Sequence, residues 1–273
     1  MPTAAKRDVS LDIALIDLVI TNRVLSRLGA VDAYGHVSVR HPTERSRFLL
    51  SHSRSPRLVE RGDIIQFDLE GRVVGADSRP LYSERFIHAA IYEVRDDVHA
   101  VAHGHPRLLL PFTVSDVPLR PLFMTADEFG ASVPLWDIRT GFGAGTNMLI
   151  SNMEQGRNLA AALGQNDRAV LLRGHGFVGA GRSASQLIRL CKALLDNAAL
   201  QLEASRFGIL KEMSSDEIDA RRRTLGADDE HPSMMRGFEY EAIEAGVKNL
   251  LKERAELKAR GSSRGGDALN RFA

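Results

Sequence analysis

Apolar residues return at helical spacing in four segments of the chain. In residues 9–28 they recur every three or four positions, which is typical of an amphipathic helix, and Gly29 is a residue that readily ends one. In the second segment Ser83 is the expected N-cap, because its side chain can accept a hydrogen bond from the first helical turn. The predicted helices cover residues 9–28, 83–95, 152–163 and 183–207.

Short apolar segments separated by Gly, Pro and Asp predict β-strands. Residues 98–105 alternate between apolar and polar positions, and Glu70-Gly71 is typical of a hairpin turn. The connections between strands are too short for a repeated βαβ pattern, so we expect an α/β or α+β fold with a mixed or largely antiparallel sheet. The predicted strands cover residues 36–40, 48–51, 63–68, 72–74, 98–105, 119–124, 133–136 and 169–173.

The chain becomes strongly charged after residue 210. Residues 240–260 predict a charged helix that ends at Gly261, and residues 261–273 are typical of a flexible tail. We therefore expect one domain over residues 1–210 and a charged helical extension over residues 211–273. A solvated surface and a contact with another subunit both fit this charge pattern.

Composition narrows the class of protein. The 273 residues include 36 basic and 35 acidic side chains, so the formal net charge is +1. A net charge this close to zero provides no strong electrostatic attraction for nucleic acid or an anionic membrane. No apolar run approaches the ~20 residues that a membrane span needs. The single cysteine, Cys191, excludes an internal disulfide framework and indicates a reducing compartment. Because the N-terminal residues do not resemble a signal peptide, we expect a cytoplasmic protein without nucleic-acid or membrane partners.

Three histidines are candidates for a metal site. His103 and His105 lie two positions apart in a predicted strand, so both imidazoles project from one face, and Pro106 ends that strand. His175 follows another predicted strand and has a glycine on each side. Imidazoles that converge from two strand ends would form a metal site with open positions, suited to Zn²⁺ and also to Mn²⁺, Fe²⁺ or Co²⁺. The alternative is that these histidines are polar residues in hydrogen-bonded turns.

Glu84 is the candidate acid or base beside this site. It falls at the start of the predicted helix that leads into the His103 strand. A carboxylate in the first helical turn is favoured by the helix dipole, so a purely capping role also fits. If this helix end faces the metal, Glu84 could be a ligand in the empty enzyme or a general acid or base. His88, one turn later, is expected to pack against the sheet.

Five segments together resemble the class II aldolase/adducin family. They are AYGHVSVRHP, FLLSHSRSP, RGDIIQFDLEGRVV, YSERFIHAAIYEVRDDVHAVAHGHP and VLLRGHGFVGAG, in this order, and the resemblance covers about residues 10–207. It implies a three-layer α/β/α fold with a central, mainly antiparallel sheet, and a homotetramer with active sites at subunit interfaces. It also implies that His103, His105 and His175 bind the metal and that Glu84 is catalytic. Adducin-like members without these histidines are not catalysts, so the intact set favours an enzyme.

The chain departs from the aldolases of this family at the substrate pocket. Those aldolases usually have Gly-Asn where this chain has Gly35-His36, and a Thr-Gly loop where it has Ser53-Arg54. Arg54 supplies a planar fork that suits a carboxylate, and His36 supplies an ionisable group. The aldolases also tend to have two small hydroxyl residues where Tyr82 and Ser83 stand here. The residues expected to bind a flat, acidic substrate are Ser53, Arg54, Arg79 and Tyr82.

The pattern GHVSVR with R-P-x-Y-x-E resembles the decarboxylase branch of the family. Members of that branch act on ring-cleavage products of the 2-hydroxy-3-carboxymuconic semialdehyde type, on dihydroxyphthalates or on a hydroxypyridine dicarboxylate. We therefore expect a metal-dependent decarboxylase of aromatic catabolism that works through a metal-stabilised enolate. Arg54 or Arg79 would orient a second carboxylate, and Glu84 or His36 would deliver the proton to carbon.

Two other functions remain open from the sequence. The first is an aldolase or epimerase for a small hydroxy-keto or sugar-phosphate substrate, since aldol cleavage creates the same kind of enolate. That reaction needs a tyrosine acid from the C-terminal region, where Tyr240 is the candidate. The second is a non-catalytic scaffold of the adducin type, which the intact histidine set disfavours.

Overall fold

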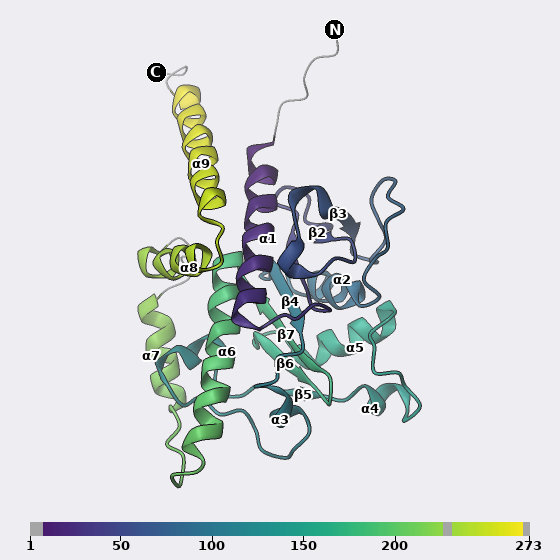
Figure 1. Cartoon of the computed structure of the whole chain (residues 1–273), viewed down its shortest axis with the longest axis vertical. Coiled ribbons are helices and arrows are strands. Elements are labelled where there is room, and N and C mark those ends of the chain that lie inside the picture. Colours follow the sequence, from purple (N-terminus) through teal and green to yellow (C-terminus); the bar gives the residue numbers. More distant parts are fainter. Residues whose placement is uncertain (1–7, 226–230, 270–273) are drawn as a thin grey trace.

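The computed structural model describes residues 8–225 and 231–269 and shows one sheet between two layers of helices (Figure 1). The strand order is β3-β2-β1-β4-β7-β6-β5, and every neighbouring pair is antiparallel except β5 and β6. The expected three-layer α/β/α fold with a mainly antiparallel sheet is confirmed. The strands are β1 His36–Arg40, β2 Arg47–Ser51, β3 Ile64–Asp68, β4 Ala100–Gly104, β5 Leu135–Trp136, β6 Ala169–Leu172 and β7 Gly176–Gly181.

Helices α1, α2, α5 and α6 begin within two residues of the predicted positions. Asp8 accepts a hydrogen bond from the backbone nitrogen of Ser10 at the start of α1, and Gly29 ends this helix with φ of 74°. Ser183 caps α6 by accepting from the backbone nitrogen of Gln186. The helices are α1 Val9–Leu28, α2 Arg85–Val94, α3 Leu110–Thr113, α4 Ile138–Phe142, α5 Met153–Leu163, α6 Ala184–Ala204, α7 Ser215–Leu225, α8 Pro232–Glu244 and α9 Lys248–Leu269.

The core is divided by the sheet into two apolar clusters. On one face Val37 of β1 and Ala102 of β4 belong to the cluster that α1 and α6 complete. On the other face Phe48 of β2 and Val101 of β4 belong to the cluster that α2 and α5 complete. Alternate residues of β2, β4 and β6 therefore belong to opposite clusters, as the strand period requires.

Strand register brings distant segments together at one end of the sheet. His36, the first residue of β1, pairs with His103 near the end of β4. Gly104, the last residue of β4, pairs with Phe177 near the start of β7. The start of β1, the end of β4 and the start of β7, which are far apart in the sequence, consequently lie side by side at this end of the sheet.

The predicted strand at 119–124 is wrong. This segment is irregular and leads into a 3-10 helix at Met124–Glu128. Its backbone nitrogens at Arg120 and Leu122 donate to the side chains of Gln201 and Asn197, at 2.8 and 2.9 Å. Because α6 side chains satisfy this backbone, the segment has hydrogen-bond partners without a neighbouring strand.

Two other local predictions also need correction. The predicted strand at 72–74 is reduced to a single bridge between Val73 and Phe67. Ser83 is not the N-cap of α2, because Glu84 occupies that position and makes no side-chain hydrogen bond to the helix backbone. The side chain of Glu84 is thereby left for contacts outside the helix.

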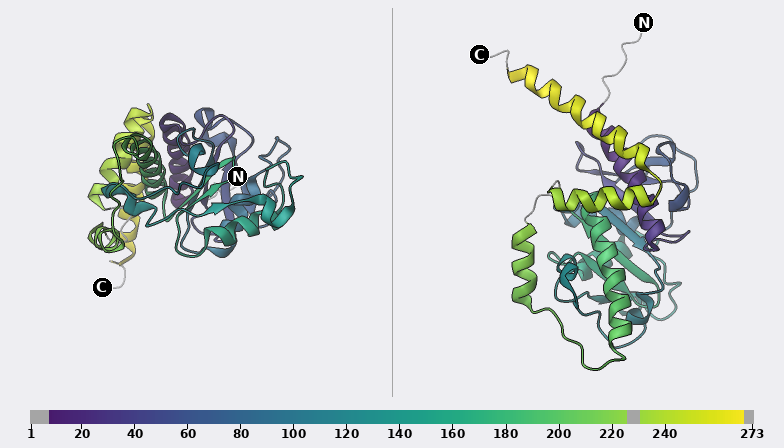
Figure 2. Two further views of the ribbon diagram at one scale, coloured as in Figure 1. Left: turned by 90° about the horizontal axis from the view of Figure 1, so that it is seen from below. Right: turned by 60° about the vertical axis from the view of Figure 1, so that its left-hand side comes forward.

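The charged C-terminal region forms two helices where one was predicted. α8 ends at Glu244, Gly246 adopts φ of 75°, and α9 then continues past Gly261 to Leu269. α8 lies against α1 and α6, α9 lies against α1 (Figure 2), and Arg254 of α9 pairs with Asp17 of α1 at 2.6 Å. Residues 261–269, which were expected in a flexible tail, continue α9, and residues 270–273 lie outside the described residues. The domain boundary at residue 210 stays a prediction.

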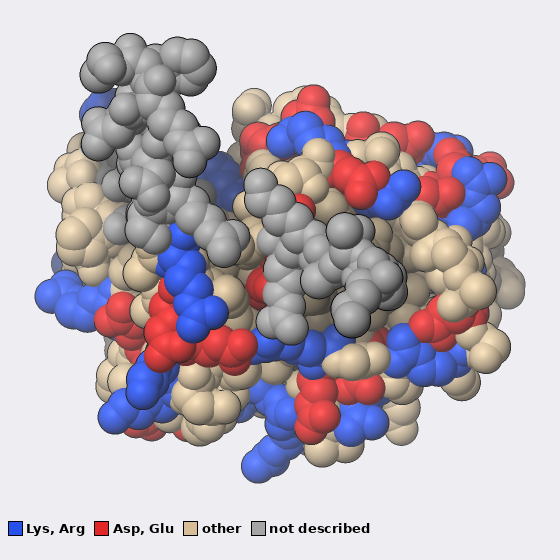
Figure 3. All heavy atoms as spheres, turned by 90° about the horizontal axis from the view of Figure 1, so that it is seen from above, with Lys and Arg blue, Asp and Glu red and all other residues tan. Residues whose placement is uncertain are grey.

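The surface carries charges of both signs. On the face seen from the end where α1 begins, basic and acidic side chains lie next to each other (Figure 3). Across residues 8–225 and 231–269, no helix combines the length and the apolar character that a membrane crossing needs.

Candidate metal centre

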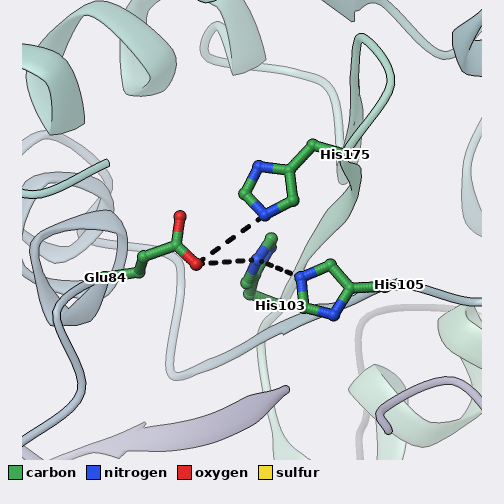
Figure 4. A group of neighbouring side chains, drawn as sticks. All are labelled: Glu84, His103, His105 and His175. Carbon is green, nitrogen blue, oxygen red and sulfur yellow. Dashed lines mark hydrogen bonds and ion pairs between the residues drawn. The ribbon is translucent and has the colours of Figure 1, made fainter. Parts of the chain in front are cut away.

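Four side chains converge at the end of the sheet where β1, β4 and the β6–β7 turn meet (Figure 4). The Nε2 atoms of His103 and His105 lie 3.1 Å apart. Glu84 Oε2 lies 3.4 Å from His103 Nε2 and 3.7 Å from His175 Nε2. One ligand atom from each of the four residues can be chosen so that all lie within 4.8 Å of one another. The histidines and the glutamate singled out in the sequence are therefore neighbours in space.

Glycines allow this approach. His103 is on β4, His105 lies just beyond it, and His175 is on the tight turn between β6 and β7. A Cβ atom added at Gly176 would lie 2.2 Å from the carbonyl oxygen of Gly104, which is far inside any real contact. A side chain at Gly176 would therefore separate the strand ends that carry the three imidazoles.

The outer nitrogens of two histidines are held by acceptors. His103 Nδ1 is 2.9 Å from the carbonyl oxygen of Phe177, and His105 Nδ1 is 3.0 Å from Asp32 Oδ1. A carbonyl and a carboxylate can only accept, so both Nδ1 atoms carry the proton and both Nε2 atoms carry a lone pair. Two such lone pairs 3.1 Å apart repel each other unless a cation lies between them.

The donor set fits a divalent ion. Tetrahedral coordination with Zn–N distances of about 2.0–2.1 Å places ligand nitrogens roughly 3.3 Å apart, close to the spacing of His103 and His105. Three imidazoles and one carboxylate suit Zn²⁺ and also Mn²⁺, Fe²⁺ or Co²⁺. Asp32, which the sequence analysis missed, supports His105 from behind, and no local pattern links these two residues because they are 73 positions apart.

Burial favours the charge states that bind a cation. It lowers the pKa of His175 to about 4, and the neighbouring His103 adds to the shift. Burial and His103 also lower the pKa of His105 below its usual value. Burial alone would raise the pKa of Glu84, but the neighbouring imidazoles of His103 and His175 and the backbone N–H of Ile150 outweigh it and lower this pKa to about 2. The neutral imidazoles of His105 and His175 therefore face an ionised carboxylate at neutral pH.

The carboxylate of Glu84 is held by the loop that precedes α5. Its Oε1 atom accepts a hydrogen bond of 3.0 Å from the backbone nitrogen of Ile150, while Oε2 faces the histidines. Two residues earlier, Met148 has φ of 68°, a conformation that few residues other than glycine adopt. The sequence analysis missed this loop because its contribution comes from the backbone.

Glu84, His105 and His175 line a cavity of about 630 Å³. His103 is fully buried beside it, with its ring 5.1 Å from that of His36. The predicted site residues that line the cavity are His36, Ser53, Arg54, Tyr82, Glu84, His105 and His175.

Arg54 and Tyr82 form one wall of the cavity. The Tyr82 hydroxyl donates to the carbonyl oxygen of Arg54, and burial raises the pKa of this phenol. Arg54 Nε lies 3.0 Å from Asp63 Oδ2. The wall thus presents a positioned cation and a neutral hydroxyl-bearing ring.

Two candidates lie elsewhere. Arg79 does not line the cavity, because its guanidinium binds Asp77 at 2.6–3.1 Å and the carbonyl oxygen of Gly62 at 2.7 Å. Tyr240 is 60% exposed on α8 and borders a different cavity, between α6 and α8. Within the described part of this chain, neither residue joins the metal cluster.

His36 has a buried partner that the sequence analysis placed only against the sheet. Its Nδ1 atom lies 2.6 Å from Nε2 of His88, whose Nδ1 atom lies 2.6 Å from the hydroxyl of Ser38. Burial, together with His103, lowers the pKa of His88 to about 3, and burial with neighbouring imidazoles lowers the pKa of His36 well below its usual value. Both rings are therefore neutral.

Comparisons with known proteins agree with the sequence resemblance. A family model described as "Class II Aldolase and Adducin N-terminal domain" matches residues 16–202. The decarboxylase tropJ of Talaromyces stipitatus is 32% identical over 189 residues, which cover 65% of this chain and 71% of that protein. The 3,4-dihydroxyphthalate decarboxylase of Arthrobacter keyseri is 28% identical over 214 residues, which cover 72% and 81%.

A solved structure shows the same fold. The L-fuculose 1-phosphate aldolase of Glaciozyma antarctica superposes with a TM-score of 0.67 and covers 94% of this chain and 95% of that one. Its sequence is 22% identical, so this likeness concerns the fold.

Proposed function

The chain belongs to the family of class II aldolases and adducins, and on this premise we propose that it is a divalent-metal-dependent decarboxylase. Its substrate would be a hydroxy-substituted aromatic or ring-cleavage dicarboxylate. The observation that carries this proposal is that the cluster of Glu84 and three histidines borders a cavity with Arg54 and His36 on its walls. The relatives named as decarboxylases support the same reaction class.

His103, His105 and His175 would hold the ion, with Glu84 as a fourth ligand or as a group beside it. A divalent ion bound there supplies Lewis-acid stabilisation for negative charge that develops on a substrate oxygen. The orientation of the substrate falls to Arg54, whose guanidinium can bind a second carboxylate in two-point fashion.

Loss of carbon dioxide breaks a carbon–carbon bond and leaves the electron pair on the substrate. That carbon then needs a proton, and the proton donor regains one from water. Glu84 and His36 both border the cavity. Low pKa values leave Glu84 ionised and His36 neutral at neutral pH, so whichever of the two delivers the proton to carbon takes it from water in the cavity.

A carbon dioxide release assay with the metal-loaded protein tests this function. We expect release from 3,4-dihydroxyphthalate or a hydroxypyridine dicarboxylate, and a loss of at least about 100-fold in Glu84→Gln. Glu93→Gln is the matched control, because Glu93 lies on the same helix but pairs with Arg157 at the surface. The proposal fails if these dicarboxylates are inert while a phosphorylated ketose is cleaved, because aldol cleavage would then be the reaction.

The assembly and the location of the protein are further proposals. We propose a homotetramer, as the family resemblance implies, and a cytoplasmic location. Sedimentation equilibrium of the full chain tests the first, and a monomer at all concentrations would contradict it.

A further inference from the structure

A chain of buried polar side chains leads from the cavity into the core between β1 and α2. It begins at His36, whose ring lines the cavity and whose Nδ1 atom lies 2.6 Å from Nε2 of His88. It continues from His88 Nδ1 to the Ser38 hydroxyl at 2.6 Å, and from there to the Tyr92 hydroxyl at 2.9 Å. Each of these four residues is at most 1% exposed, so solvent does not share these hydrogen bonds.

Both elements present this chain through their regular periods. His36 and Ser38 are two positions apart on β1, so they project from the same face of the sheet. His88 and Tyr92 are four positions apart on α2, so they lie one above the other on the same face of the helix. Each hydrogen bond of the chain therefore joins a side chain of β1 to a side chain of α2.

The proton on His88 couples the two ends of the chain. A neutral imidazole has one N–H group and one lone pair, and both nitrogens of His88 are engaged. His88 therefore donates in one of its two hydrogen bonds and accepts in the other. If it accepts from Ser38, it must donate to Nδ1 of His36, and His36 then carries its own proton on Nε2.

The Tyr92 end fixes the direction. Among the described residues, the acceptor within reach of the Tyr92 hydroxyl proton is Ser38 Oγ. If Ser38 donated to Tyr92 instead, the buried phenol proton would have no acceptor, which is costly. At the other end, water or substrate in the cavity can pair with either a donor or an acceptor, so that end sets no direction. The protons therefore run from Tyr92 to Ser38, to His88 and then to His36.

We propose that Tyr92, Ser38 and His88 are positioning residues that lock His36 as its Nε2–H tautomer, with this N–H presented to the cavity. His36 is then a neutral hydrogen-bond donor, through its Nε2–H group, to an anionic substrate oxygen. The tautomer follows from the hydrogen-bond chain alone, whereas its use in turnover rests on the proposed function.

Nitrogen NMR of histidine-labelled, Zn²⁺-loaded protein tests the tautomer without any activity measurement. The His36 and His88 signals are assigned by their loss in His36→Asn and His88→Phe. We expect both rings to be protonated on Nε2. A His36 ring protonated on Nδ1 would overturn the proposal.

Tyr92→Phe tests transmission along the chain, because it removes one distant hydroxyl and keeps the ring that fills the core. We expect the Nδ1–H tautomer of His36 to appear in this variant. Phe48→Leu is the matched control, since Phe48 packs 5.5 Å from the Tyr92 ring but has no hydrogen-bonding side chain. A purely structural role predicts lower thermal stability in both variants and an unchanged His36 tautomer, which would refute the proposal.

Turnover provides the second measurement. Tyr92→Phe and His88→Phe should lower kcat by about tenfold or more with little change in KM, and Phe48→Leu should leave both constants near the wild-type values. Unchanged kcat in His88→Phe would contradict the role in turnover. If the wild-type protein releases no carbon dioxide from any dicarboxylate, the proposed function fails while the NMR result still decides the tautomer.

Discussion

The two faces of β1 are equally buried but chemically opposite. Val37 and Val39 belong to the apolar cluster that α1 and α6 cover. His36, Ser38 and Arg40 face α2 and are at most 4% exposed. Burial therefore does not separate structural from functional positions in this strand, whereas hydrogen-bond partners do.

The buried polar side chains of this face are stabilised by hydrogen bonds. Arg40 donates to the carbonyl oxygens of Val98, Arg45, Tyr92 and Arg95 at 2.8–3.0 Å. A buried polar group without a partner costs about 1–3 kcal/mol, so an unpaired version of this face would destabilise the fold. The polar face also continues into the metal cluster, because His36 pairs with His103 across the strands. The apolar face has no such continuation.

Removal of a metal ligand should produce the largest difference between the faces. In His103→Ala we expect affinity for the divalent ion to fall by at least about 100-fold, because a direct ligand is removed and loss of an outer-shell partner alone costs about 10–100-fold. Val37→Ala on the apolar face should lose about 2 kcal/mol of stability and retain the ion. Elemental analysis after gel filtration measures both, and equal metal loss in the two variants would remove the distinction.

The second-largest expected effect is a loss of folding stability when Arg40 on the polar face is replaced. Arg40→Met keeps the aliphatic stem but removes four hydrogen bonds to carbonyl oxygens, three of them buried, so we expect a loss of about 3–5 kcal/mol. Val39→Ala should lose about 2 kcal/mol. Chemical unfolding of both variants is the measurement, and a smaller loss in Arg40→Met than in Val39→Ala would show that this pairing contributes little.

Acid should destabilise the polar face specifically. The pKa of His88 is lowered from 6.5 to about 3, so the unfolded chain binds one more proton than the folded chain in this window. Stability is therefore complete above about pH 6.5 and falls as the pH decreases, by about 1.4 kcal/mol per unit from this residue. Unfolding free energies from about pH 6 to pH 4 should fall less steeply in His88→Phe than in the wild type. Leu190→Met, in the opposite cluster, should keep the wild-type slope.

The sequence predicted the positions of helices, strands and candidate residues better than the tertiary contacts between them. The histidine and glutamate candidates were found because each marks an element end, and the glycines beside His175 already indicated close approach. Strand β7 was missed because GFVGAG has weak strand propensity, although Gly181 is required where a Cβ would lie 2.9 Å from the backbone nitrogen of Leu187. The segment at 119–124 was misassigned because its hydrogen-bond partners are side chains of a helix about 80 positions away.

The polar chain did have a signal in the sequence. Glu84, His88 and Tyr92 recur at the helical period, and His36, Ser38 and Arg40 recur at the strand period. That these two patterns face each other depends on tertiary packing, which periodicity alone does not provide. Arg79 shows the converse. Its position in the loop near Tyr82 predicted a role in substrate binding, but in the structure its guanidinium pairs with Asp77.

The smallest expected effects are changes in KM, and they test whether Arg54 at the rim of the cavity takes part in substrate binding. Arg54 lines the cavity, so Arg54→Gln should raise KM for an acidic substrate by about tenfold, the loss of a charge-assisted contact, with little change in kcat. Arg79→Gln is the matched control, because Arg79 is held by Asp77 outside the cavity and should leave KM within about twofold. Steady-state kinetics of the two variants separate them. An unchanged KM in Arg54→Gln would limit the functional part of the polar face to the histidines and Glu84, because substrate recognition would then need no cation at this rim.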